Sequence, residues 1–485
     1  MAAMDWFTSW FSASGYGLSR LVLQRALACI YLVAFLSAAM QYRALLGERG
    51  LLPARIFVRR IPFREAPSLF HWRCTDRFVT GCAWFGTALS AALLVGAGDV
   101  VPLWASMLMW ALLWALYLSF VNVGQIFYGF GWESLLLETG FLAVFLGNAD
   151  VAPPILVLFL LRWLLFRVEF GAGLIKWRGD PCWRDLTCLY YHHETQPMPG
   201  PLSWHFHRLP RPLHRVEVAA NHVAQLIVPF GLFFPQPVAT VAAAIVIVTQ
   251  LWLVTSGNFS WLNWLTMILA LSAVDSSPVT GTPSYAATPA WFAVLVCAAA
   301  LLIVLLSYWP ARNLLSRSQQ MNRSFNPLHL VNTYGAFGSV TRVRQEVVLE
   351  GTDEEQITKD TVWREYEFKG KPGDVRRLPR QFAPYHLRLD WQMWFAALSP
   401  LYTRGWFDRL LERLLENDRA TLALLRHSPF PDHPPTHVRA LLYRYRFTTA
   451  RERRETGAWW HRTYVREFLP PVQLDQTGRP GRSFG

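Results

Sequence analysis

The chain has 485 residues, of which 53% are hydrophobic and only 16% are charged, and its formal net charge is +13. Soluble domains carry roughly a quarter charged residues, so the composition excludes an ordinary soluble enzyme and indicates a membrane protein. Most of the basic excess follows Pro310, where we expect it to face the anionic surface of a lipid bilayer; no recognition motif accompanies it that would indicate nucleic acid.

Nine apolar runs before Pro310 are candidate membrane spans, because about twenty apolar residues cross a hydrocarbon core. They are 18–40, 78–96, 101–121, 132–146, 154–170, 216–234, 237–255, 261–274 and 289–309. The fourth and eighth runs are short, so we expect about eight or nine crossings. The sequence therefore predicts a multi-helix transmembrane domain over 1–310, with a polar insert at 171–215.

Three basic regions should share one side of the membrane if all nine runs cross it. They are 41–77, 171–215 and the chain that follows Pro310. Loops rich in Arg favour the cytoplasm. The sequence alone therefore places these regions in the cytoplasm and the N-terminus outside.

Several ionisable residues lie within the apolar runs or at their ends, where each needs a partner or a wet cavity. They are Glu133, Glu138, Arg162, Arg167, Glu169, Glu217 and His222. Arg162 and Glu169 are seven residues apart and should share a helix face. Two interpretations stay open, namely ion pairs that hold the bundle together and a polar cavity beneath the insert.

The insert concentrates the chain's polar chemistry between two apolar halves. Its candidate site residues are Lys176, Trp177, Arg178, Asp180, Trp183, Asp185, His192, His193 and Glu194. Lys176 is the only Lys before Pro310. Its side chain either extends to the membrane interface or is a desolvated amine that acts as a base.

Two Cys residues and a run of His residues raise the question of a metal. Cys182 and Cys188 lack the pair spacing of a zinc site; they form a disulfide in an oxidising compartment and are free thiols in the cytosol. His205 and His207 would share one face of a strand. No carboxylate stands at a recognisable ligand spacing from the His residues, so we predict no metal site and no cofactor.

The pattern after Pro310 predicts a soluble C-terminal α+β domain, 311–485, built on an antiparallel sheet. Strands are expected at 340–349, 362–368, 386–390, 440–448 and 459–468, and helices at 389–398 and 406–425. We expect the last ten residues to be loose. The chain has no P-loop, nucleophile elbow, zinc-protease motif or dinucleotide fingerprint.

The chain resembles the lipase maturation factor family over nearly its whole length. The strings that carry the resemblance are NVGQIFYGFGWESLLLETGFLAVFL (122–146), CWRDLTCLYYHHETQP (182–197), PLSWHFHRLP (201–210), NTYGAFGSV (332–340), EYEFKGKPGD (365–374) and APYHLRLDWQMWFAAL (383–398). The resemblance implies a multi-pass protein, of the endoplasmic reticulum membrane in animals or the cell membrane in a bacterium. In animals such proteins present the tail to the lumen and help secreted lipases reach their active form.

The resemblance also implies that the tail binds a client lipase or another exported protein. We assign this contact to one segment of the tail. Its candidate residues are Tyr385, His386, Arg388, Asp390, Trp391 and Trp394.

A shorter stretch, FGAGLIKWRGDPCWRD (170–185), is similar to the surroundings of the catalytic Lys in vitamin K-dependent γ-carboxylases. That similarity implies a base centre at Lys176 acting on a lipid-soluble substrate, although the rest of the carboxylase site is not recognisable. Our leading hypothesis is a non-catalytic, membrane-anchored maturation factor. The alternative is a membrane enzyme that uses Lys176.

Overall fold

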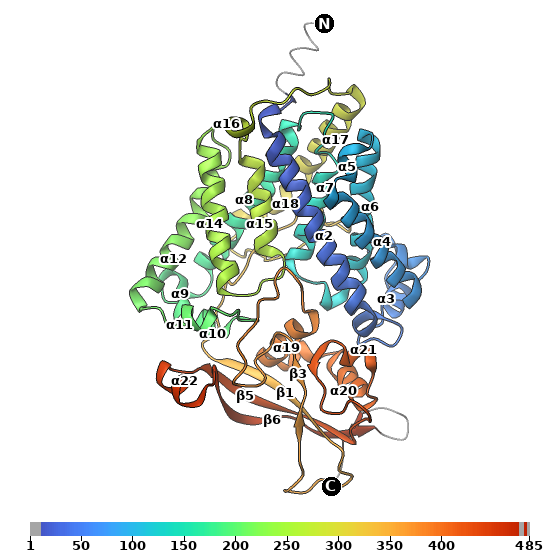
Figure 1. Cartoon of the computed structure of the whole chain (residues 1–485), viewed down its shortest axis with the longest axis vertical. Helices are drawn as coiled ribbons and strands as arrows, with labels where there is room; N and C mark the ends of the chain where they lie inside the picture. The colour runs from blue at the N-terminus through green and yellow to red at the C-terminus, as the bar shows by residue number, and fades with distance from the viewer. Residues whose placement is uncertain (1–10, 475–479, 483–485) are drawn as a thin grey trace.

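The computed structural model describes residues 11–474 and 480–482. A bundle of helices forms one end of an elongated molecule, and a β-sheet forms the other (Figure 1). Within the described residues, five helices are long and apolar enough to cross a membrane. These candidate spans are Ser14–Leu46, Asp76–Val95, Leu103–Val123, Val238–Ser256 and Ala290–Leu315.

All nine predicted runs fold as helices. The five candidate spans contain α2 (Gly17–Leu46), α4 (Asp76–Val95), α6 (Leu103–Val123), α14 (Val238–Ser256) and α17 (Ala290–Leu306) with α18 (Tyr308–Leu315). The other four runs are α7 (Gly131–Ala143), α8 (Ile155–Arg178), α12 (Arg211–Leu226) with α13 (Val228–Gly231), and α15 (Leu262–Ala270). The number of crossings, predicted as eight or nine, is therefore not established beyond five candidates.

The short helices α7 and α15 lie inside the bundle, whereas the long apolar helices α14 and α17 lie at its outside. Leu135, Leu136 and Leu137 of α7 are fully buried, and α15 packs against α2, α7, α8 and α14. By contrast, α14 and α17 expose apolar side chains such as Val248 and Leu305, as helices facing lipid do. Neighbouring helices thus surround these short helices in the place that lipid would otherwise occupy.

The two ends of the bundle differ in charge. The Arg-rich helix α3 (Ala54–Arg60) and the insert helices α9 (Pro181–Arg184), α10 (Leu189–Thr195) and α11 (Ser203–His207) lie at the end that carries the sheet (Figure 1). These basic segments therefore lie at the same end of the molecule, and their side of the membrane stays a prediction. The loops at the other end, 96–102, 147–154 and 274–289, each contain an Asp and contain neither Arg nor Lys.

The tail contains an antiparallel sheet, which confirms a helical membrane part joined to a sheet-bearing part. Its strand order is β2-β1-β5-β6-β7. The strands are β1 (Arg344–Thr352), β2 (Arg364–Glu365), β5 (His437–Phe447), β6 (Trp460–Leu474) and β7 (Pro480–Arg482), beside a separate pair of β3 (Glu367–Phe368) and β4 (Leu425–His427).

Two details of the tail differ from prediction. The expected strand at 386–390 is wrong, because this stretch leads into α19 (Arg388–Leu398), whose apolar face packs on β1. The expected helix at 406–425 is interrupted: α20 (Phe407–Leu415) ends before Asn417, whose φ is 53°, and Asp418 caps α21 (Arg419–Leu422) through Thr421 N. Of the ten terminal residues predicted to be loose, the described ones, 480–482, form β7.

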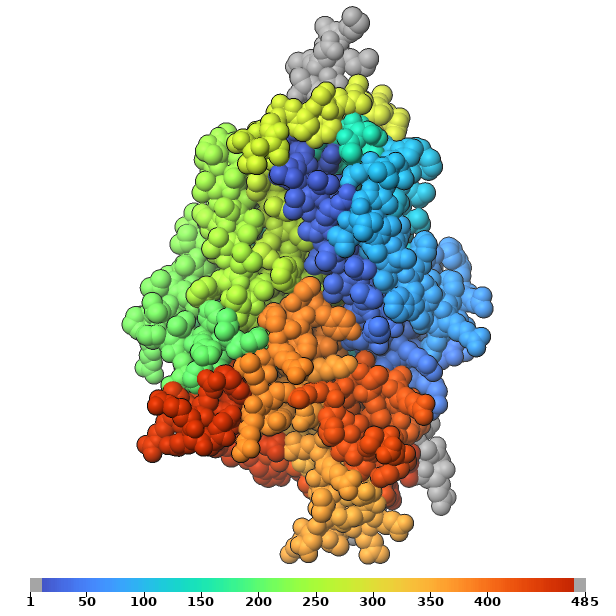
Figure 2. Space-filling view, in the orientation of Figure 1, coloured from blue at the N-terminus to red at the C-terminus, as the bar shows by residue number. Residues whose placement is uncertain are grey.

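The tail inserts into the bundle instead of resting beside it. Figure 2 shows the orange part of the tail rising between the blue and green parts of the bundle. Trp391 of α19 lies 4.9 Å from Trp132 of α7, measured between ring centroids, and one hydrophobic core extends from Phe11 to Val472. The two parts therefore share a single core.

Two buried carboxylates of α7 connect the tail to the bundle. Glu133 Oε1 accepts hydrogen bonds from Arg388 Nη1 of α19 at 2.5 Å and lies 3.2 Å from His386 Nδ1, and all three side chains are fully buried. Glu138 forms an ion pair with Arg167 of α8. These contacts confirm internal ion pairs for Glu133, Glu138 and Arg167.

The second carboxylate also binds the string 332–340. Glu138 Oε2 accepts from Asn332 N at 3.0 Å and from the Tyr334 hydroxyl at 2.8 Å. Arg162 and Glu169, which we expected to share a face, have other partners: Arg162 Nε donates to Ser272 O at 3.1 Å, and Glu169 Oε1 accepts from Gln250 Nε2 at 2.6 Å.

We predict that Arg388→Met lowers the free energy of unfolding by about 3–5 kcal/mol, because it leaves the Glu133 carboxylate buried without its cation. Thermal unfolding of the purified protein in detergent measures the effect. Arg451→Met is the control, since Arg451 and its partner Glu455 are exposed at the surface. Equal unfolding midpoints for the Arg388 variant and the unmodified protein would contradict a stabilising ion pair between Arg388 and Glu133.

Candidate functional site

Lys176 lies in the last turn of α8, and its ammonium is buried. Nζ donates to Asn221 Oδ1 at 2.9 Å and to Gln225 Oε1 at 3.0 Å, and it lies 4.9 Å from the centre of the Trp183 ring. Only 6% of the residue is exposed, so the side chain does not extend to an interface. Two amide oxygens and an aromatic face instead hold a cation inside the protein.

The polar chain continues from Lys176 into the bundle. Gln250 of α14 donates to Glu169 of α8, and Asn263 Nδ2 of α15 donates to Gln250 Oε1 at 2.8 Å. Together with Gln225, which bonds to both Lys176 and Glu169, these side chains connect α8, α12, α14 and α15. They satisfy one another by hydrogen bonding, which is what buried polar groups require.

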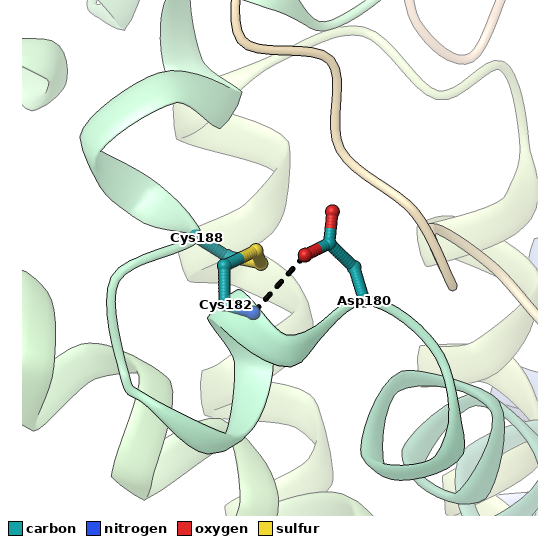
Figure 3. Close-up of side chains that lie close together, drawn as sticks. All are labelled: Asp180, Cys182 and Cys188. Atoms are coloured by element: carbon teal, nitrogen blue, oxygen red, sulfur yellow. Dashed lines mark hydrogen bonds between the residues drawn. A yellow bond between two sulfur atoms is a disulfide. The ribbon is translucent and has the colours of Figure 1, made fainter.

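The first turn of the insert is fixed by a disulfide and a capping carboxylate. Cys182 and Cys188 are bonded, and Asp180 Oδ1 accepts from Cys182 N at 3.0 Å (Figure 3). Arg342 Nη2 of the tail donates to the same oxygen at 2.8 Å, and this guanidinium holds the pKa of Asp180 below its ordinary value. Trp183 Nε1 donates to Phe337 O at 2.8 Å.

The other predicted insert residues do not converge on one centre. Arg178 Nη1 donates to Leu314 O and Ser316 O, each at 2.9 Å, whereas Trp177 is half-exposed and Asp185 is exposed. His192 lies against Phe337 with ring centroids 4.8 Å apart, and Glu194 Oε2 accepts from Phe447 N at 2.7 Å. His193 faces His214 of α12.

The predicted client-binding segment is internal. Exposure of His386, Arg388 and Asp390 is at most 1%, and that of Trp391 is 4%. Tyr385 accepts from Gln41 Nε2 at 3.2 Å, and Trp394 Nε1 donates to Thr195 O at 3.2 Å. In this conformation the segment contacts the bundle and the insert, and of the six predicted residues Tyr385 and Trp394 are partly exposed.

Comparison with known proteins follows the same division into two parts. Residues 18–280 match the model of the lipase maturation factor transmembrane domain, and residues 330–470 match that of the lipase maturation factor C-terminal domain. The chain is 41% identical to Lipase maturation factor 1 of Homo sapiens, over 95% of this chain and 89% of the relative. The chain belongs to the lipase maturation factor family.

Other members of the family align over similar lengths. Lipase maturation factor 1 of Bos taurus is 41% identical over 95% of this chain and 90% of the relative. Lipase maturation factor 2 of Homo sapiens is 29% identical over 95% of this chain and 83% of the relative. No solved structure matches the chain. In this chain, residues of the strings that carry the resemblance form contacts between bundle, insert and tail.

We predict that this lipase maturation factor homologue, unfolded without reductant, reacts with four equivalents of a thiol reagent, because Cys29, Cys74, Cys82 and Cys297 are free. After reduction it should react with six, since Cys182 and Cys188 are then released. Mass spectrometry of the protein isolated from its membrane counts the additions. Six additions before reduction would show that the disulfide does not form.

The carboxyl group of Asp390 gives a second prediction. Burial raises the pKa of Asp390 to about 6, although Gly370 N donates to its Oδ1 at 2.6 Å. A pKa raised by folding stabilises the protein fully below the unfolded value of about 4, and this contribution is lost as pH rises through about 6. The total change is about 3 kcal/mol.

The variant Asp390→Asn should therefore lose this part of the pH dependence, and its stability relative to the unmodified protein should grow between pH 4 and pH 7. Unfolding midpoints measured across that range test this. Asp432→Asn, at an exposed position, is the control and should follow the unmodified profile. If the unfolding midpoints of Asp390→Asn and the unmodified protein change in parallel with pH, the raised pKa of Asp390 is refuted.

Proposed function

We propose that this chain is a membrane-anchored maturation factor for secreted lipases or other exported proteins. The 41% identity to Lipase maturation factor 1, over nearly the full length of both chains, carries the proposal. The chain contains both family domains, and its apolar helices support a multi-pass membrane protein. The class of client, a secreted lipase, comes from the names of these relatives.

We further propose that the tail and the insert face the oxidising side of the membrane, where exported proteins fold. The Cys182–Cys188 disulfide supports this side, because cytosolic thiols are kept reduced. The Arg residues of 41–77 favour the opposite side by the usual charge rule. That rule depends on loops crossing the membrane unfolded, whereas a disulfide records the compartment in which the loop folded.

The enzymatic alternative has weaker support. A catalytic base must reach its substrate, whereas Lys176 is only 6% exposed and its Nζ donates to Asn221 Oδ1 and Gln225 Oε1. The hydrogen bonds of Lys176 are those of a cation that joins α8 to α12.

Strand β6 of the sheet is more exposed than the predicted client-binding segment. Residues 463–467 of β6 are consecutively exposed, and they include Tyr464 at 55% and Val465 at 44%. An exposed strand with apolar side chains suits a partly folded client, which still exposes apolar segments and unpaired strand edges. We propose that a folding lipase contacts the tail at this strand.

Co-expression tests the proposal. The full chain, expressed with a secreted lipase in a host that lacks the factor, should raise the activity per lipase molecule. Val465→Arg should reduce this gain severalfold, because it places a charge in the proposed contact. Val279→Arg, at an exposed apolar position on the opposite end of the molecule, is the matched control and should keep the gain. No gain with the unmodified chain, for any lipase tried, would overturn the proposed function.

A further inference from the structure

Three potential metal ligands meet where the insert contacts the bundle. His193 comes from α10, and His214 and Glu217 come from α12. Their ligand atoms all lie within 4.8 Å of one another. The side chains of both His residues are 2% exposed and that of Glu217 is 16% exposed, so the cluster is an internal feature.

The spacing of these atoms is too long for hydrogen bonds and close to that of metal ligands. Glu217 Oε2 lies 3.8 Å from His193 Nε2 and 3.7 Å from His214 Nδ1. Zinc–ligand bonds of about 2.0–2.2 Å at tetrahedral angles separate neighbouring ligand atoms by about 3.3–3.5 Å. Movements of a few tenths of an ångström would bring Glu217 Oε2 to this spacing from each imidazole nitrogen, and the two His ligand atoms lie within 4.8 Å of each other.

The same atoms have no hydrogen-bond partner. Both ring nitrogens of His193, Nδ1 of His214 and Oε2 of Glu217 are buried and unpaired. Buried polar groups in proteins are nearly always satisfied, so these four unpaired atoms, one from each of the three converging residues among them, require an explanation. A bound cation satisfies three of them together.

The surroundings hold the carboxylate in place. Trp252 Nε1 of α14 donates to Glu217 Oε1 at 2.7 Å, which leaves Oε2 directed at the two imidazoles. Phe206 packs on His193 with ring centroids 5.5 Å apart and on Trp252 at 4.9 Å. An outer hydrogen bond to a ligand and an apolar wall are typical of protein metal sites.

The sequence contains part of this signal. His214 and Glu217 are three residues apart on α12, so they share one helix face, as the Glu-x-x-His pairs of metal-binding bundles do. Our prediction of no metal site overlooked this spacing. It also placed His205 and His207 on a strand, whereas they lie on α11.

We propose that His193, His214 and Glu217 bind a divalent transition-metal ion, with Zn²⁺ the preferred occupant. Two imidazoles and one carboxylate are ligands that zinc accepts, and they leave a fourth position for water or another ligand. The ion would join α10 of the insert to α12 of the bundle. It would thereby fix the segment that carries the Cys182–Cys188 disulfide and the contacts with the tail.

Metal analysis of the full-length protein, purified with a tag that contains no His, tests the proposal. We expect about one zinc ion per chain by inductively coupled plasma mass spectrometry. Iron at the same stoichiometry would support the site and change the assigned ion, because two His and one carboxylate also suit Fe²⁺. Absence of any stoichiometric transition metal, even after incubation with Zn²⁺, would overturn the proposal.

Variants separate a bound ion from a merely structural cluster. His214→Asn and Glu217→Gln should lose the metal, whereas His205→Asn, an exposed His of the same segment, should keep it. If a ligand variant does not fold, the unmodified protein still decides the question. Cobalt substitution should produce the visible absorption of a tetrahedral site, and a chelator should lower the unfolding temperature. The absence of both the cobalt absorption and the chelator effect would refute the site.

Discussion

The structure depends on two buried carboxylates of the bundle, each of which also binds residues that follow the bundle in the chain. Glu133 and Glu138 lie on α7 with no exposed surface, and an unpaired charge in such a place costs several kcal/mol. Arg388 of the tail pairs with the first, while Arg167 and the backbone at Asn332 bind the second. The helical part is therefore completed by residues that follow it by some two hundred positions. This explains why bundle and tail share one core.

The insert also contacts the tail where the tail meets the bundle. Arg344 of β1 donates to Glu194 O at 3.0 Å and to Pro197 O at 3.1 Å, and Asp180 N donates to Gly338 O at 2.8 Å. These residues lie in or beside the strings that carry the family resemblance, which therefore include places where bundle, insert and tail touch.

Much of the fold follows from the sequence, because apolar runs and strand patterns are local signals. All nine runs are helices, and the antiparallel sheet lies in the tail. The partners of the charged residues were not predictable from local pattern. Arg388 and Glu133 are 255 residues apart in the sequence. An Arg among aromatic residues is typical of a binding segment, and only the structure shows that the bundle buries this one. His193 likewise joins His214 and Glu217 only through the packing of α10 on α12, although the spacing of His214 and Glu217 was readable.

The side of the membrane decides whether the account holds, because a factor for exported proteins must present its tail where they fold. Single Cys residues at Tyr464 and at Val279, which lie exposed at opposite ends, measure this directly. Each is placed in a chain whose four free Cys residues are replaced by Ser, and intact cells or sealed vesicles are treated with an impermeant thiol reagent. We predict that Tyr464→Cys is labelled only from the oxidising side and Val279→Cys only from the cytosolic side. The reverse pattern would contradict the account, since the disulfide and the client surface would then lie in the cytosol.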